Sequence, residues 1–272
     1  MGATVHDQKR IHLTGTPNVT VRTFNGSLEV RAWDRNEILV DIEKRARTIE
    51  DAREIRVETS EDNGDVVIAA RSPERRDFIR FGWSRSPSVR LVVTVPRELS
   101  VDARTGDGTI DVRNIKGRIQ LRSGDGSIRL DEVEGDINVT TGDGPVMARD
   151  VQGVVAVNTG DGSIEMSGRF DAVRARTGDG TIAVDALPGS TMRSEWRISS
   201  GDGGVRIRLP EEFDADVLAQ TGDGGISTTG VEILNPQRSE ESDRHNVRGR
   251  IGKGGEMLTV RTGDGSIQVV AR

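Results

Sequence analysis

The phrase Gly-Asp-Gly recurs through the last two-thirds of the chain and constrains the fold more than any other feature. Ser or Thr precedes each copy, and Ile or Val stands two residues after it. The first five copies begin at a constant interval and three follow at looser spacing; they start at Gly106, Gly124, Gly142, Gly160, Gly178, Gly201, Gly222 and Gly263. A fixed period of this length is typical of a repeat architecture, in which each repeat buries its apolar side only against its neighbours.

Apolar residues alternate with polar ones on both sides of each copy. Around Gly106 they are Val101, Ala103, Ile110 and Val112. The equivalent positions of the next four copies are Ile119, Leu121, Ile128, Leu130, Ile137, Val139, Val146, Ala148, Val155, Val157, Ile164, Met166, Val173, Ala175, Ile182 and Val184. This alternation predicts short strands with one buried face. We therefore expect an all-β fold: a single parallel β-solenoid, or β-helix, of about 18-residue coils stacked about 4.8 Å apart.

The first 98 residues predict a strand-rich segment in front of this array. Val19, Val21, Leu28 and Val30 surround Asn25-Gly26 with the repeat spacing, which predicts a degenerate first copy. Thr48 is placed to cap the one short helix expected. Residues 55–70 predict a hairpin that turns at Asn63-Gly64.

The predicted domain organisation is one elongated domain over residues 1–272. It consists of the strand-rich part, 1–98, and the Gly-Asp-Gly array, 99–272. Residues 235–255 are polar and charged, and we expect them to form a protruding loop. The chain then ends in a strand, which we expect to need protection from edge pairing.

Composition excludes several classes of function. A net charge of −6, with 38 basic and 44 acidic residues, argues against a nucleic-acid partner. Cysteine is absent, which excludes disulfides and thiolate metal sites. No apolar run is long enough to span a membrane. The first ten residues lack the apolar centre of a signal peptide, so the sequence leaves a cytoplasmic location open.

The Gly-Asp-Gly phrase has a structural interpretation. Glycine on both sides of Asp predicts positive φ angles at a tight corner. The Asp side chain predicts an Asx-turn. The neighbouring Ser and Thr residues predict a ladder of hydroxyls from coil to coil. In this interpretation the phrase makes a corner between two strands and binds nothing.

The alternative interpretation is a calcium-stabilised β-roll. The candidate ligands are the five aspartates that stacking would align, Asp107, Asp125, Asp143, Asp161 and Asp179. Carboxylates one strand spacing apart repel by roughly 1 kcal/mol in water, and a calcium ion would relieve this repulsion. Arg104, Arg122 and Arg176 lie two residues before a copy and could neutralise the row instead, so the favoured expectation is no cofactor.

A stretch with a different composition, Arg71–Ser88, supplies the interface candidates. It is rich in Arg, Ser and Pro and carries Phe78, Arg80, Phe81 and Trp83. Exposed aromatic residues among arginines suit a protein interface. The other interpretation is a cap in which these aromatic residues are buried against the strands.

The sequence offers little that indicates an enzyme. His6, His12 and His245 are not at a metal-ligand spacing. A nucleophile elbow and a phosphate-binding loop are both absent. A carbohydrate-active β-helix with paired carboxylates is the least favoured function, because short uniform coils leave little room for a cleft.

Three features together resemble a large bacterial family of β-strand-repeat proteins that carry the label "putative adhesin", formally a domain of unknown function. They are the strand pair Val19–Val30, the segment Val89–Arg97 and the ordered series of Gly-Asp-Gly copies. The resemblance covers nearly the whole chain. It implies a parallel β-solenoid that is non-enzymatic and often exported to the cell envelope or the extracellular space.

The resemblance leaves the partner open. An unknown protein or polysaccharide surface is expected, and end or edge packing would give a homo-oligomer. A bactofilin-like scaffold, which polymerises end to end, is the runner-up among structural proteins. Bactofilins generally lack the Asp-centred corner and the long N-terminal strand region.

Overall fold

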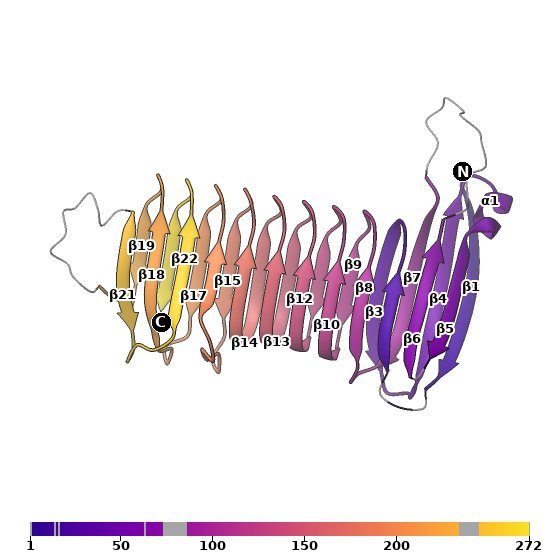
Figure 1. Ribbon diagram of the computed structural model, residues 1–272, viewed down its shortest axis with the longest axis horizontal. Coiled ribbons are helices and arrows are strands. Elements are labelled where there is room, and N and C mark those ends of the chain that lie inside the picture. Colours follow the sequence, from indigo (N-terminus) through magenta and orange to yellow (C-terminus); the bar gives the residue numbers. More distant parts are fainter. Residues whose placement is uncertain are drawn as a thin grey trace, which may run out of the picture. The chain divides into compact units, whose positions relative to one another are not determined.

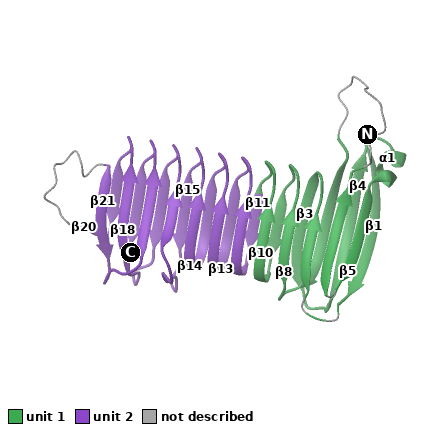
Figure 2. Cartoon of the chain, viewed as in Figure 1, with its two compact units in different colours: residues 1–127 green, residues 128–272 purple. Residues whose placement is uncertain are grey.

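The computed structural model describes residues 2–13, 15, 17–62, 64–72, 86–233 and 245–271. The fold is all-β, with 63% of the residues in strands and 2% in helix, and most strand pairs are parallel (Figure 1). The chain divides into two compact units, Met1–Ser127 and Ile128–Arg272 (Figure 2). Among the residues described, no helix is long and apolar enough to cross a membrane.

Unit 1 contains two rows of hydrogen-bonded strands, which we name row A and row B. Row A runs in the order β1 (Ala3–His12), β4 (Glu37–Ala46), β7 (Ser88–Pro96), β3 (Gly26–Trp33) and β9 (Ile110–Arg113). Row B runs in the order β5 (Arg56–Asp62), β6 (Asp65–Arg71), β2 (Asn18–Arg22), β8 (Ser100–Arg104) and β10 (Lys116–Arg122). The pairs β1–β4, β4–β7 and β5–β6 are antiparallel, and the other pairs are parallel.

The degenerate first copy predicted around Asn25-Gly26 is confirmed. Val19 pairs in register with Val101, and Leu28 pairs with Ile110. Asn25-Gly26 therefore lies beside the copy that begins at Gly106. This first copy of unit 1 thus stacks on a copy that is far from it in the sequence.

The other local predictions for unit 1 are also confirmed. The helix α1 spans Ile49–Glu54, and the Thr48 hydroxyl accepts a hydrogen bond from the Asp51 N–H at 3.1 Å. Strands β5 and β6 form the expected hairpin, with Gly64 at φ +86°. Asn63 itself lies outside the described residues.

Unit 2 also has two rows. Row A runs in the order β11 (Ile128–Asp131), β13 (Val146–Asn158), β14 (Ile164–Arg176), β15 (Ile182–Ala186), β17 (Val205–Leu209), β23 (Ile267–Ala271) and β19 (Ile226–Thr229). Row B runs in the order β12 (Glu134–Thr140), β13, β14, β16 (Trp196–Ser199), β22 (Met257–Thr262), β18 (Ala215–Thr221), β21 (Asn246–Ile251) and β20 (Glu232–Ile233). The long strands β13 and β14 contribute their first halves to row A and their second halves to row B.

In the first strand pairs of row B, the offset between paired residues equals the sequence period, and in a later pair it is larger. Ile137 pairs with Val155, which pairs with Val173, so each step equals the interval between the first Gly-Asp-Gly copies. The next step in row B, from Ala175 to Ile198, is longer. Beside it, buried Trp196 contacts the rings of Phe170 and Phe213 edge-on, at centroid distances of 6.1 and 5.2 Å. This aromatic cluster fills the core where the period changes.

The final copy does not lie at the end of unit 2. Strand β22 pairs with β16 on one side and β18 on the other, and β23 pairs with β17 and β19. The C-terminal strand β23 is therefore protected from edge pairing, as expected, by a neighbour on each side. The protruding loop expected at 235–255 was wrong in part, since Asn246–Ile251 is strand β21; residues 234–244 lie outside the description.

The predicted apolar columns form the core. Every alternating position of the first five copies, from Val101 to Val184, is at most 3% exposed. Because the intervening positions point away from the core, each row presents an outward face of polar side chains.

Candidate functional site

The two glycines of each Gly-Asp-Gly copy are required by close stacking. A Cβ atom on Gly160 would lie 2.7 Å from the Gly142 carbonyl oxygen, and one on Gly162 would lie 2.1 Å from the Gly144 oxygen. The prediction that these glycines need positive φ was wrong, since none of them has it. Positive φ occurs instead at the opposite corner, at Asn114, Glu132, Asp150, Gly117, Gly135 and Gly153.

The Ser or Thr before each copy closes the turn. The Thr177 hydroxyl accepts a hydrogen bond from the Gly180 N–H at 3.3 Å and donates one to the Gly162 carbonyl of the neighbouring copy at 2.8 Å. Ser123 and Ser200 make the same pair of bonds. The hydroxyls therefore bond to the backbone, whereas the sequence predicted a hydroxyl-to-hydroxyl ladder.

The aspartates form the outer surface of the corner. Asp107 and Asp125 of unit 1, and Asp143, Asp161 and Asp179 of unit 2, are all exposed. The Asp161 carboxylate covers the first glycine of the next copy, because a Cβ on Gly178 would lie 2.6 Å from its Oδ1. In the described ranges no three His, Cys, Asp or Glu side chains gather as a metal site. Calcium binding at this row stays a prediction.

The interface candidates Phe78, Arg80, Phe81 and Trp83 lie outside the described residues. Strand β6 of row B ends at Arg71, before these residues, and strand β7 of row A begins at Ser88, after them.

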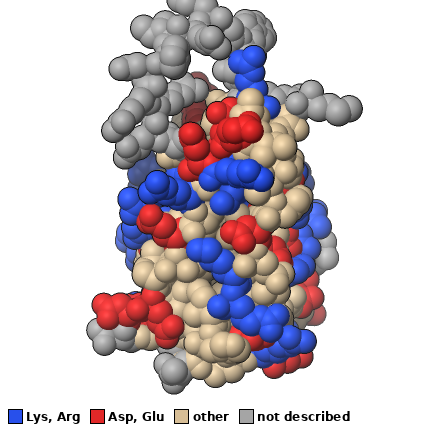
Figure 3. All heavy atoms as spheres, turned by 90° about the vertical axis from the view of Figure 1, so that its right-hand side faces the viewer, with Lys and Arg blue, Asp and Glu red and all other residues tan. Residues whose placement is uncertain are grey.

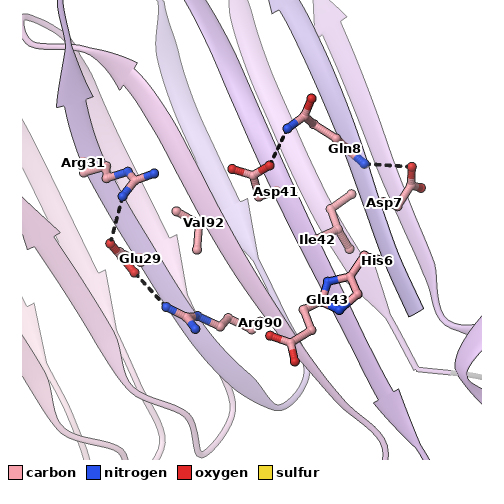
Figure 4. A pocket seen from close by; sticks show the side chains of 10 residues that line it. All are labelled: His6, Asp7, Gln8, Glu29, Arg31, Asp41, Ile42, Glu43, Arg90 and Val92. Carbon is pink, nitrogen blue, oxygen red and sulfur yellow. Dashed lines mark hydrogen bonds and ion pairs between the residues drawn. The ribbon is translucent and has the colours of Figure 1, made fainter. Parts of the chain in front are cut away.

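A broad groove of about 800 Å³ lies on row A of unit 1 (Figure 4). Its side chains come from four strands: His6, Asp7 and Gln8 of β1; Asp41, Ile42 and Glu43 of β4; Arg90 and Val92 of β7; and Glu29 and Arg31 of β3. Most of its charges are paired across or along strands. Glu29 contacts Arg31 at 3.8 Å and Arg90 at 3.2 Å, and Glu43 contacts Arg45 at 2.6 Å. Cross-strand pairs of this kind stabilise a sheet.

Comparison with protein families identifies the chain's relatives. Residues 12–270 match the model described as Toastrack DUF4097, a domain of unknown function. The chain belongs to the Toastrack DUF4097 family. This match confirms the resemblance inferred from the Gly-Asp-Gly series, which was to a family that is formally a domain of unknown function.

Solved structures match the Toastrack chain over most of its length at low identity. A "Putative lipid binding protein" from Parabacteroides distasonis is 14% identical, with a TM-score of 0.53 over 97% of this chain and 96% of that one. A "putative adhesin" from Bacteroides fragilis is 8% identical, with a TM-score of 0.35 over 98% and 97% of the two chains. A search of curated proteins finds no match.

The groove is a feature of this Toastrack chain that sequence reasoning missed. Two of its four strands, β1 and β4, pair antiparallel through a register of ten residues that carries no Gly-Asp-Gly phrase. The alternation within Ile38, Val40 and Ile42 indicates a strand but does not indicate which strand it joins. No local signal in the sequence brings His6 beside Glu43.

Proposed function

We propose that this Toastrack chain is a non-enzymatic, adhesin-like scaffold of the cell surface or cell envelope. In this proposal the fold is a β-solenoid with coils of about 18 residues, the spacing between Gly106 and Gly124. The chain binds a protein or polysaccharide surface through the outward faces of its strand rows. One observation carries the proposal: the repeat residues build the corner and the core, and the outward side chains, some of them paired across strands as Asp185 is with Arg208, lie on an open face.

The division of roles is visible within one coil of unit 2. Thr177 and Gly180 hold the corner, and Ile182 and Val184 fill the core. Ala183 and Asp185 point outward; Ala183 takes no part in the corner or the core, and Asp185 contacts Arg208 of the next strand at 3.9 Å. Regular strands thus present a wide, open array of side chains. Such an array suits contact with a polymer or another surface, whereas small-molecule sites are concave and enclose most of their ligand.

Cosedimentation with envelope fragments tests the proposal. Folded chain and heat-unfolded chain are each mixed with washed envelope fragments of the source cells, and the bound fraction is measured against concentration. We expect saturable binding of the folded chain alone. Equal recovery of folded and unfolded chain, or recovery of neither, would contradict the proposal.

The non-enzymatic part of the proposal has a separate test. Of the four groove carboxylates, Glu29 and Glu43 are held by arginines, and Asp7 and Asp41 accept hydrogen bonds from Gln8. A glycoside hydrolase needs two carboxyl groups free to act as acid and base or nucleophile. We expect no release of reducing ends from a panel of polysaccharides. Cleavage that is lost in a Glu29→Gln or Glu43→Gln variant would favour an enzyme.

A further inference from the structure

A second hollow, of about 350 Å³, lies on row B of unit 2 around Ala156. Two outward columns of side chains cross it. One column is Asn138, Ala156, Arg174 and Arg197, and the other is Thr140, Asn158, Arg176 and Ser199. The methyl group of Ala156 is the smallest side chain in either column, so the longer side chains around it rise above it and form the walls.

The charge of this hollow is positive, although the chain carries a net charge of −6. Arg174 and Arg176 are exposed, and neither forms an ion pair with another residue that the structure describes. Arg197 contacts the Glu195 carboxylate at 2.5 Å. That hydrogen bond lowers the pKa of Glu195, with smaller contributions from a bond donated by Thr259 and from the charge of Arg174. Arg174 and Arg176 therefore remain available to an external anion.

The positive charge continues along the row. Ser199 pairs with Arg261 and Arg197 pairs with Thr259, so the two columns extend onto β22. From β12 to β22 these columns contain four arginines and no carboxylate, as the registers Asn138–Thr259 and Thr140–Arg261 show. The outward positions of row A in unit 2 differ, because Glu165 and Asp185 alternate there with basic residues.

Guanidinium groups bind carboxylates through two parallel hydrogen bonds. Asn138 and Asn158 add amide donors and acceptors that suit sugar hydroxyls. We propose that this arginine hollow, formed by Asn138, Ala156, Asn158, Arg174, Arg176 and Arg197, binds a linear acidic polysaccharide and seats a uronate carboxylate over Ala156. The inference rests on the proposed binding function and assigns it a site and a class of ligand.

Two other anionic partners fit the hollow less well. A membrane surface would favour a cluster of large apolar side chains that insert, whereas of the exposed large apolar residues described only Val154 and Met257 lie on row B, and neither lines the hollow. A single-stranded nucleic acid would favour aromatic side chains for base stacking, and none lines the hollow.

Titration calorimetry with alginate oligosaccharides tests the inference, with neutral dextran oligosaccharides as the control ligand. Wild type should bind alginate saturably, and Arg174→Thr/Arg176→Thr should weaken binding by at least about tenfold. Arg129→Thr/Arg149→Thr removes two exposed arginines from row A and should change the affinity by less than about twofold. Far-UV circular dichroism confirms that each variant is folded.

Two single variants separate shape from charge. Ala156→Gln fills the hollow without changing the charge and should also weaken binding. Glu195→Gln removes the partner of Arg197 and should strengthen it. Equal losses in the two double-arginine variants, or no effect of Ala156→Gln, would overturn the site.

Further outcomes would overturn the ligand class. If anionic phospholipid vesicles or oligo-dT bind more tightly than alginate and lose binding with Arg174→Thr/Arg176→Thr, the hollow serves that partner instead. Failure of wild type to bind alginate overturns this inference alone if the chain still cosediments with envelope fragments. Failure in both experiments overturns the proposed function as well.

Discussion

At the scale of single residues, the second glycine of a Gly-Asp-Gly copy is a position where unit 2 tolerates little change. A Cβ on Gly162 would meet a neighbouring backbone oxygen at 2.1 Å, and backbone in a parallel ladder cannot shift as a side chain can. Gly162→Ala should therefore lower the free energy of unfolding by about 3 kcal/mol or more. Denaturant unfolding measures this. Gly225→Ala is the matched control, because nothing lies within 4 Å of its Cβ; an equally large effect there would contradict the stacking argument.

The aspartate row leads to a second prediction at this scale. The aspartates are exposed, and like charges one strand spacing apart cost roughly 1 kcal/mol in water. If no cation relieves this repulsion, Asp161→Asn should leave the thermal midpoint unchanged or raise it. EDTA should not shift the midpoint of the wild type. A midpoint that falls in EDTA and recovers with added calcium would instead support the calcium-stabilised roll.

At the scale of strands, the inserted final copy couples distant parts of unit 2. Strand β22 lies between β16 and β18, and strand β23 lies between β17 and β19. In stacked architectures stability is passed between nearest neighbours. Deletion of residues 256–272 should therefore abolish hydrogen-exchange protection in β16–β19 while β13 and β14 keep theirs.

A complementation experiment controls for general damage by this deletion. A peptide of residues 256–271, added to the truncated chain, should restore protection in β16–β19, because two strand edges are open to it. A peptide with Val260→Asp and Val269→Asp should fail, since both valines are fully buried. Retained protection without any peptide would show that β16–β19 do not depend on the insertion.

Strand-level features differ in how far the sequence could predict them. The alternation of apolar residues and the constant interval between copies predicted the core columns and the first copy at Val19–Val30. They could do so because burial of one strand face requires both patterns. The order of stacking was not predictable, since every copy presents the same backbone and Ser or Thr contacts to its neighbour. The arginine hollow follows from the lengthened step that aligns Arg174 with Arg197, and no periodicity indicates that step. The glycine φ prediction failed because glycine serves close approach as well as positive φ.

At the scale of the whole molecule, the edge strands decide whether copies associate. The edges of unit 1 are β1 and β5, whose sequences mix acids and bases. Figure 3 faces the side where these strands lie and shows Lys and Arg interspersed with Asp and Glu. Charged edge strands oppose pairing with a second copy, because an added strand would desolvate those charges. We therefore expect no filaments in electron microscopy, because filament growth needs an open edge on each unit. Light scattering at micromolar concentration should show at most a dimer, since β19 of unit 2 is an edge strand without charges.

Removing charge from the edge should reverse this outcome. In Asp7→Thr/Arg10→Thr, β1 keeps its strand propensity and its net charge while losing two charged side chains. Self-association of this variant should rise with concentration. A control with the same charge change away from the edges, Asp131→Thr/Arg149→Thr on row A of unit 2, should associate no more than the wild type. Filaments of wild-type chain would instead support a polymerising, bactofilin-like scaffold, since end-to-end growth requires that these edges accept a neighbour.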